Sequence, residues 1–242
     1  MRCFLVRHAQ TIWNGENRLQ GHSDLPLSPL GLEQAKRVGA YFRALREAGV
    51  GLRRLYVSHL QRSQQTAQAI GSEIGLAPTI EPAFAEIGLG QWEGLTPEEI
   101  DARFAGAYEQ WKTTPSMVSI PGAEPLALFR ARVRQAFTAM LTAHQKESGD
   151  LVVVTHGGVI ASLLADCVEA DYDRFLRGVS LENAGVSAVN CRHVPPVVMW
   201  VNATTHLTSA DDRPLWMGSA GATSSLPSSP SLPVSSSRPS QP

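Results

Sequence analysis

The sequence LVVVT, from Leu151 to Thr155, decides the fold class of this chain. Four consecutive apolar residues, three of them valine, are typical of a central strand that is buried on both faces of a parallel sheet. The motif HGG follows at 156–158, and an apolar helix is expected over 159–167. The stretch therefore predicts a strand that runs straight into a helix, which is half of a β-α-β unit.

The N-terminal half repeats this alternation of strand and helix twice. The apolar run at 3–6 predicts a buried strand, and a loop is expected over 14–26. Ser28 is a good N-cap and Pro29 suits the first helical position, so a helix is expected from there to about Gly49. A second strand and helix are expected over 52–58 and 62–75.

The rest of the chain adds further elements to the same plan. The sequence predicts an extended piece at 79–84, a helix after Thr96-Pro97, a longer helix over about 124–144, and two late strands. These strands, at 185–194 and 197–201, are expected to form a hairpin at a sheet edge. The fold class is therefore α/β, with three α/β/α layers and a largely parallel central sheet.

Composition excludes several classes of protein. The chain has 242 residues, 43% of them apolar, and a formal net charge of −1, which gives no broad nucleic-acid footprint. Its three cysteines lack CxxC spacing and predict neither a disulfide framework nor a zinc site. The first apolar run ends at Arg7 and is too short for a signal peptide, and no stretch reaches the roughly 18 apolar residues of a membrane span. A cytoplasmic location without membrane contact is the expectation.

The last part of the chain differs in composition. From about Ser209, nearly half of the residues are serine or proline and few are large and apolar. Such a segment cannot bury enough surface to offset the entropy lost on ordering. We therefore expect one folded domain at 1–207, with a helical cap-like segment at about 94–123, and a disordered tail at 208–242.

Candidate functional residues follow three predicted strands. Arg7 and His8 end the first strand, Arg62 lies near the start of a helix after the second, and His156 with Gly157 follows the valine-rich strand. Each also has a simpler interpretation: a surface arginine, a solvated helix start, or a histidine satisfied in the core. In open α/β sheets, however, the carboxyl ends of the strands are where ligands bind.

Taken together, these residues predict a cationic pocket in an otherwise neutral protein. Two arginines can bind phosphate in a bidentate way, a histidine can act as a nitrogen nucleophile, and the Gly157 N–H can face the same anion. The sequence contains no Walker A or GxGxxG motif, and the spacing of His and carboxylate residues suggests no metal cluster. The pocket therefore suits transfer of a phosphoryl group without a cofactor or a metal.

The sequence resembles the histidine phosphatase superfamily, the phosphoglycerate-mutase-like group. The resemblance covers about residues 1–201 and rests on motifs that occur in the family's order. They are LVRHAQT at 5–11 with Trp13-Asn14, LQG at 19–21, DLPLS at 24–28, SHLQR at 58–62, Glu86, QWEG at 91–94 and VTHGG at 154–158.

The resemblance implies a role for each matched residue. His8 would attack phosphorus and become phosphohistidine, while Arg7, Arg62 and His156 would hold the phosphoryl oxygens. Glu86 would protonate the leaving oxygen and then activate water, which suits a carboxyl group in a pocket. The resemblance also implies that Asn14, Gln20 and Gly21 line the phosphate site.

The family contains both mutases and phosphatases, so the fold does not choose between them. Mutases of the group carry a longer insert after the position of Glu86, with paired arginines that bind a second phosphoryl group. Here residues 88–94 lead directly into a compact helical stretch, and Arg130 and Arg132 alternate on the expected long helix. This favours a phosphomonoester hydrolase, similar to the broad-specificity and α-ribazole phosphatases.

Two alternatives remain. One is a mutase dependent on 2,3-bisphosphoglycerate, and the other is a non-catalytic phosphate-binding protein. The partner expected is a small phosphorylated substrate, with no nucleic acid and no membrane, and a homodimer is left open. The aromatic residues of the cap-like segment, Phe104, Tyr108 and Trp111, suit either a core or a pocket wall, as does Lys112.

Overall fold

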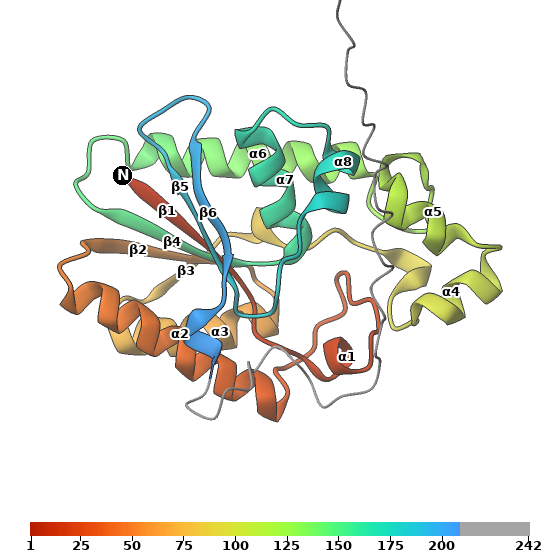
Figure 1. Cartoon of the computed structure of the whole chain (residues 1–242), viewed down its shortest axis with the longest axis horizontal. Helices are drawn as coiled ribbons and strands as arrows, with labels where there is room; N and C mark the ends of the chain where they lie inside the picture. The colour runs from red at the N-terminus through yellow and green to blue at the C-terminus, as the bar shows by residue number, and fades with distance from the viewer. Residues whose placement is uncertain (209–242) are drawn as a thin grey trace, which may run out of the picture.

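A computed structural model of the chain describes residues 1–208, which form a six-stranded sheet between two layers of helices (Figure 1). The predicted tail lies outside the described residues except for Thr208. The strand order across the sheet is β3-β2-β4-β1-β5-β6. The strands are β1 (Arg2–Arg7), β2 (Leu52–Val57), β3 (Pro78–Ile80), β4 (Asp150–Thr155), β5 (Val186–Asn190) and β6 (Val197–Ala203).

The sheet is parallel over its first four positions. β4 lies between β2 and β1, and all three run in the same direction, as does β3. β5 pairs antiparallel with β1, and β6 pairs antiparallel with β5, which confirms the predicted hairpin at the sheet edge. The three-layer α/β fold with a largely parallel sheet is confirmed.

Apolar side chains along the two central strands point alternately to the two faces of the sheet, so both faces must be covered by helices. In β4, Leu151 and Val153 face one core, whereas Val152 and Val154 face the other. All six residues of β4 are buried, as a central strand requires. β1 follows the same alternation, so each central strand contributes to both hydrophobic cores.

Two helices cover each face (Figure 1). The side chains of Phe42 and Ile70, from α2 and α3, belong to one core, and those of Phe129 and Leu164, from α6 and α7, belong to the other. The α-helices are α1 (Ile12–Gly15), α2 (Pro29–Glu47), α3 (Gln61–Ile74), α4 (Pro97–Arg103), α5 (Ala107–Thr113), α6 (Leu126–Ala143), α7 (Gly157–Cys167) and α8 (Tyr172–Gly178).

The predicted cap-like segment, at about 94–123, contains α4, α5 and η3 (Pro115–Met117). In Figure 1, α4 and α5 lie beyond the end of the sheet opposite to the N-terminus, which is the end where β1 and β4 finish. Short 3-10 helices connect these parts. They are η1 (Pro82–Phe84), η2 (Gly90–Trp92) and η3 (Pro115–Met117), and a fourth, η4 (Thr205–Leu207), follows β6.

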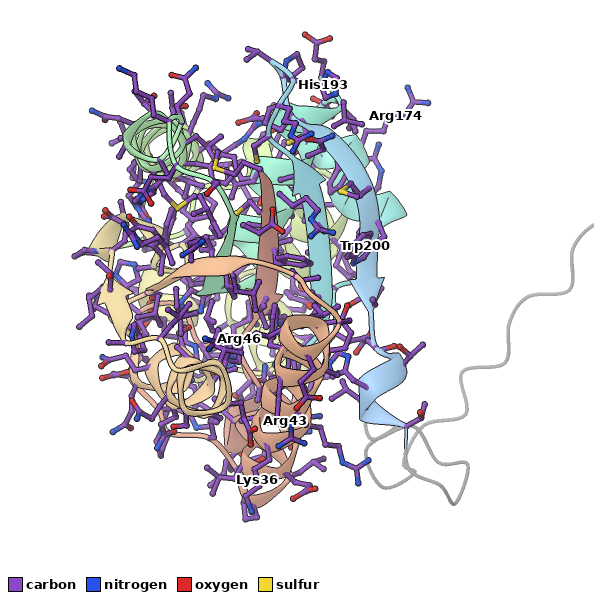
Figure 2. All side chains as sticks on the ribbon, turned by 90° about the vertical axis from the view of Figure 1, so that its left-hand side faces the viewer. Lys36, Arg43, Arg46, Arg174, His193 and Trp200 are labelled. Atoms are coloured by element: carbon purple, nitrogen blue, oxygen red, sulfur yellow. The ribbon has the colours of Figure 1, made fainter. Side chains whose placement is uncertain are left out.

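The edge of the sheet and the outer face of α2 are both exposed (Figure 2). Lys36, Arg43 and Arg46 occupy the solvent face of α2. On β6, Trp200 packs toward the core, with its ring centroid 6.1 Å from that of Phe4. No helix within residues 1–208 combines the length and the apolar character needed to cross a membrane.

Several local predictions were wrong, and each error has a local reason. The extended piece expected at 79–84 ends at Ile80, because Pro82 opens the 3-10 helix η1. The loop expected over 14–26 begins only after Gly15, because α1, a single turn capped by Thr11, includes its first two residues. The helix α8 was not predicted, since seven residues give too little periodicity.

Candidate functional site

A pocket of about 300 Å³ opens where β1 ends and α3 and α7 begin. This is the carboxyl edge of the parallel strands, where the sequence predicts a ligand site. Seven of the nine predicted site residues line it, and His156 and Gly157 lie directly behind, beside His8 and Arg7. The seven are Arg7, His8, Asn14, Gln20, Gly21, Arg62 and Glu86.

His8 is held in one tautomer and is uncharged. Its Nδ1 lies 2.8 Å from the carbonyl oxygen of Ala9, which can only accept, so Nδ1 carries the proton and Nε2 carries a lone pair. Burial, followed by the charges of Arg62 and Arg7, lowers the pKa of His8 well below its usual value. The ring is therefore a neutral nitrogen base at neutral pH.

Arg62 is positioned by backbone carbonyls rather than by a carboxylate. It is 1% exposed, and its two terminal nitrogens donate to the oxygens of Ser23 and Gly21, each at 2.8 Å. Burial lowers the pKa of Arg62 to about 10, so it remains a cation at neutral pH. The guanidinium is thus fixed at the start of α3, with its charge available to an anion in the pocket.

Arg7 is held in a similar way from the other side. Its Nη1 donates to the carbonyl oxygen of Leu181, which lies in the loop between α8 and β5. Although burial lowers the pKa of Arg7, the charges of Glu86 and Glu182 act in the opposite direction. Like Arg62, it is a cation oriented by a neutral acceptor.

His156 lies behind His8, with the two ring centroids 5.1 Å apart. It is fully buried, and its Nε2 lies 2.8 Å from the hydroxyl of Ser58. Burial, followed by the charges of Arg62 and Arg7, lowers the pKa of His156 well below its usual value. Both rings at the centre of the site are therefore neutral.

Three buried nitrogens around this centre lack a hydrogen-bond partner among the described residues: Nε of Arg7, Nε of Arg62 and Nδ1 of His156. Arg7 ends β1, His156 directly follows β4, and Arg62 lies in the first turn of α3, which follows β2. A buried donor without a partner is costly, so a group that accepts hydrogen bonds here is favoured. Together with the two guanidinium charges, these nitrogens form a site for an anion.

Glu86 lies on the opposite wall and is half-buried. One carboxylate oxygen accepts from the N–H of Ile87 at 3.0 Å, and the other accepts from the N–H of Gly158 at 3.1 Å. A Cβ on Gly158 would lie 2.4 Å from Oε1 of Glu86. The second glycine of the HGG motif therefore makes room for this carboxylate.

Asn14 and Gln20 share one partner, Thr11. The Thr11 backbone N–H donates to Oδ1 of Asn14 at 3.0 Å, and its hydroxyl donates to Oε1 of Gln20 at 2.9 Å. With both amide oxygens engaged, the amide nitrogens are the ends that remain to donate to a ligand. The single-turn helix α1, which was not predicted, brings Asn14 into the pocket.

Sequence reasoning missed the residues that reach the site from distant parts of the chain. Asn183 donates to the carbonyl oxygen of His8 at 3.0 Å and lies 3.3 Å from Oδ1 of Asn14. Tyr172 and Leu176, both on α8, and Arg18 line the pocket. No local motif marks these positions, because only tertiary contacts bring them to the site.

The structure assigns the aromatic residues of the cap-like segment to different places. Trp111 lines the pocket. Phe104 and Tyr108 pack on the buried ring of Trp92 instead, with centroids 6.1 and 6.4 Å away. Lys112 pairs with Glu109 at 2.6 Å on the surface.

Arg130 and Arg132 on α6 are both engaged elsewhere. Arg130 pairs with Asp166 at 2.6 Å. Arg132 pairs with Glu124 and also donates to the carbonyl oxygen of Glu86 at 2.9 Å. Neither guanidinium lines the pocket, so neither supplies a second anion site there.

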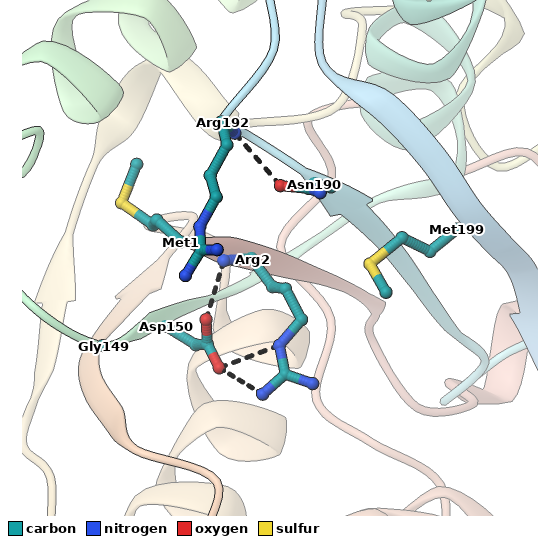
Figure 3. Close-up of a pocket in the computed structure, with 7 residues that line it drawn as sticks. All are labelled: Met1, Arg2, Gly149, Asp150, Asn190, Arg192 and Met199. Carbon is teal, nitrogen blue, oxygen red and sulfur yellow. Dashed lines mark hydrogen bonds and ion pairs between the residues drawn. The ribbon is translucent and has the colours of Figure 1, made fainter.

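A further cavity, of about 390 Å³, lies at the other end of the sheet (Figure 3). Arg2 fills one side of it, with its guanidinium bound to Asp150 at 2.6 and 3.0 Å. Met1, Asn190, Arg192 and Met199 also line it. This cavity lies at the amino ends of β1 and β4, away from the histidines and from Glu86.

Comparison with known proteins gives a family match over nearly the whole described chain. The profile of the histidine phosphatase superfamily (branch 1) matches residues 3–204. A probable phosphoglycerate mutase, GpmB, from Yersinia pestis (strain Pestoides F) is 31% identical over 225 residues. The alignment covers 88% of this chain and 93% of that protein.

Solved structures with the same fold include several phosphatases. A mycobacterial glucosyl-3-phosphoglycerate phosphatase matches with a TM-score of 0.72 and 27% identity, covering 84% of this chain and 98% of that one. A putative alpha-ribazole-5'-P phosphatase from Escherichia coli K-12 matches with a TM-score of 0.73 and 25% identity, covering 84% and 96%. A phosphoserine phosphatase from Entamoeba histolytica matches with a TM-score of 0.71 and 26% identity, covering 85% and 98%.

Proposed function

This chain belongs to the histidine phosphatase superfamily, branch 1, and is a phosphatase of that type, and on this basis we propose that it hydrolyses a small phosphorylated metabolite through phosphohistidine at His8. The observation that carries the proposal is the state of His8. Its Nε2 has a lone pair, its ring is uncharged, and it lies among two arginines with Glu86 in the same pocket. A nitrogen nucleophile needs that protonation state.

In the first step, Nε2 of His8 attacks phosphorus and the bond to the ester oxygen breaks. Glu86 gives its proton to that oxygen, so the alcohol leaves uncharged and phosphohistidine remains. In the second step, Glu86 takes a proton from water as the water oxygen attacks phosphorus. The phosphorus–nitrogen bond then breaks, which releases inorganic phosphate and restores His8 and the Glu86 carboxyl group.

The other predicted residues stabilise the phosphoryl group during both steps. Arg7, Arg62 and His156 hold the oxygens whose charge must be stabilised in transfer. Asn14, Gln20 and the backbone at Gly21 and Gly157 complete the surroundings of the phosphate. These groups supply positive charge and hydrogen-bond donors, so the proposal assigns no metal and no cofactor to the reaction.

The direct test is the His8→Ala variant assayed with p-nitrophenyl phosphate. Hydrolysis should fall by at least about a thousandfold, since no other group in the pocket replaces the nucleophile. The matched control is His193→Ala, on the exposed turn between β5 and β6, which should keep the wild-type rate. Acid-labile phosphate trapped on the wild type but not on the His8 variant would identify the intermediate. Substantial turnover by His8→Ala would exclude the assignment.

The role of Glu86 is tested separately with Glu86→Gln. Turnover should slow most for alkyl phosphates, whose alcohols are poor leaving groups, and least for p-nitrophenyl phosphate, whose leaving group needs little protonation. The measurement is kcat across a series of leaving groups. Equal slowing across the series would show that Glu86 is not the acid.

A second candidate, a mutase dependent on 2,3-bisphosphoglycerate, is favoured by the 31% identical relative from Yersinia pestis. The positions of Arg130 and Arg132 oppose it, because both side chains are bound outside the pocket. Incubation with 3-phosphoglycerate, with and without 2,3-bisphosphoglycerate, distinguishes the two. A mutase forms 2-phosphoglycerate, and only with the bisphosphate, whereas a hydrolase forms no 2-phosphoglycerate in either case.

A further inference from the structure

A second cavity adjoins the phosphate pocket. It has a volume of about 320 Å³, and both cavities are lined by Ile87 and Trp111, so they meet at these two side chains. The phosphate pocket alone measures about 300 Å³. A substrate bound through its phosphate therefore has a defined place into which the rest of the molecule can extend.

The wall shared by the two cavities is rigid. The Trp111 ring packs edge-on against Trp92, with centroids 5.8 Å apart and planes at 75°. Trp92 is 1% exposed and anchors the cap-like segment. Trp111 is thus held in place before any ligand arrives, which lowers the entropy cost of binding against it.

The second cavity is mainly apolar. Most of its lining comes from the segment between η3 and the first turn of α6. The phosphate pocket also has apolar lining residues besides Ile87 and Trp111, namely Leu19, Leu89 and Leu176. The apolar residues of the second cavity, besides Ile87 and Trp111, are Val118, Ile120, Ala123, Pro125, Leu126 and Ala127.

The charge of the second cavity excludes an anion. Among the residues that line it, the one charged group is Glu124, and no lysine, arginine or histidine is present. Although burial acts to raise the pKa of Glu124, hydrogen bonds and charge from Arg132 lower it below its usual value. A carboxylate or a second phosphate placed here would lie beside Glu124, whose counterion Arg132 is already bound to Glu124 and to backbone carbonyl oxygens.

The polar groups that remain are hydroxyls. The Ser116 hydroxyl is already bound to Asp173. Ser119 is exposed at the rim and can donate to or accept from a ligand. Arg18, a cation that lines the phosphate pocket, is bound to Glu99 and to the carbonyl oxygen of Gly94, at 2.8 and 2.6 Å.

We propose that the second cavity is the subsite for the alcohol part of the substrate, and that it takes a bulky, uncharged and largely apolar group. This inference rests on the proposed function, because it describes the leaving group of the same reaction. It separates this chain from enzymes whose substrates carry a carboxylate next to the phosphate ester. Trp111 and Ile87 line both cavities, and Ser119 meets a neutral polar group at the rim.

Three aryl phosphates test the subsite in the wild type. Phenyl phosphate fits within the first pocket, 2-naphthyl phosphate extends past it, and 6-carboxy-2-naphthyl phosphate adds a negative charge to the same frame. Wild-type kcat/KM should rise about tenfold from phenyl to 2-naphthyl phosphate, mostly through KM, because more apolar surface is buried. It should fall by about tenfold or more when the carboxylate is added.

Variants at the exposed Ser119 test the location. Ser119→Trp should fill the cavity and lower kcat/KM for 2-naphthyl phosphate about tenfold, with less than a twofold change for phenyl phosphate. Ser119→Arg should raise kcat/KM for the carboxylated substrate by about fivefold or more. Met117 is 72% exposed and lines neither cavity, so Met117→Trp and Met117→Arg are the matched controls and should change neither ratio.

The outcomes separate this inference from the proposed function. Equal wild-type rates for the two naphthyl substrates, or equal effects of Ser119→Trp on phenyl and naphthyl substrates, would overturn the subsite while hydrolysis still stands. No hydrolysis of phenyl phosphate or p-nitrophenyl phosphate by the wild type would overturn the proposed function itself. A naphthyl preference that is lost only in the Ser119 variants supports both.

Discussion

The two central histidines illustrate how burial sets a protonation state. His8 is 3% exposed and His156 is fully buried, and two arginine guanidinium groups lie close to both rings. Burial and these positive charges oppose the addition of a proton to either ring. Below about pH 6.5 their neutrality is therefore a property of the folded state, because the same rings take up protons when the chain unfolds.

The stability of the protein should depend on pH for this reason. The folded pKa of each ring lies below the unfolded value of about 6.5, so below that pH the unfolded chain binds protons that the folded chain does not. As the pH is lowered below about 6.5, the free energy of unfolding should therefore decrease by up to about 1.4 kcal/mol per pH unit for each ring.

Urea titrations at pH 7.5, 6.0 and 5.0 measure this dependence. His8→Asn should flatten the loss of stability between pH 6.0 and 5.0 by up to about 1.4 kcal/mol per pH unit, and the exposed His193→Asn should not. Comparing slopes removes the contribution of other titrating groups. An identical slope in the wild type and in His8→Asn would show that His8 is not held neutral by the fold.

Gly158 makes a second prediction at the residue scale. In Gly158→Ala, the added Cβ meets Oε1 of Glu86, so the carboxylate must move and lose its bond to the residue-158 N–H. We expect kcat for alkyl phosphates to fall by about tenfold to a hundredfold, with a smaller loss for p-nitrophenyl phosphate.

The matched control for this change is Gly178→Ala. An added Cβ at Gly178 meets nothing within 4 Å, so its kinetics should match the wild type. If Gly158→Ala slows both classes of substrate equally, or neither, the contact with Glu86 does not govern proton transfer.

The sequence indicated where the candidate site residues lie better than it indicated the residues that support them. Arg7 ends β1, His8 and His156 directly follow β1 and β4, and parallel strands bring their carboxyl ends together. Glu86 was identified only through the family resemblance. The short helix η1 and the loop after it have no periodic pattern of apolar residues that would indicate which way the Glu86 side chain points. Asn183 was not found at all, since nothing near it in the sequence shows that it contacts the His8 carbonyl oxygen.

At the scale of elements, the length and burial of a segment decided whether it could be predicted. β4 is buried on both faces, and the apolar run at 151–154 indicates this. α2 is long enough for the helical spacing of its apolar residues to be recognised. The short helices α1 and α8 depend on caps and on neighbours instead. Propensity over so few residues is too weak to indicate them.

The N-cap of α2 gives a prediction at this scale. The Ser28 hydroxyl accepts from the Gly31 N–H at 3.0 Å and donates to Oε1 of Gln10 at 2.9 Å. Ser28→Ala should therefore lower the free energy of unfolding by about 1 kcal/mol or somewhat more. Ser72→Ala, at an exposed serine inside α3, should change it by less than about 0.5 kcal/mol. Urea denaturation measures both, and equal losses would show that the cap has no special effect.

At the scale of the whole molecule, the sheet separates a stabilising end from a reactive end. The amino ends of β1 and β4 are tied by Asp150, which accepts from the backbone N–H of Arg2 at 2.7 Å and pairs with its guanidinium at 2.6 Å. The carboxyl ends of the same strands lead into His8 and His156. Between the two ends lie only the buried apolar residues of the strands.

This separation predicts that Asp150→Asn changes stability without changing the chemistry. The Asp150 side chain is 11% exposed, and loss of its charge weakens two bonds to a partly exposed arginine, so unfolding should become easier by about 2 kcal/mol. At temperatures where the variant remains folded, kcat and KM for p-nitrophenyl phosphate should stay within about twofold of the wild type. A large change in kcat would mean that the sheet transmits strain from its amino end to His8. The cavity drawn in Figure 3 would then have to be included in any account of turnover.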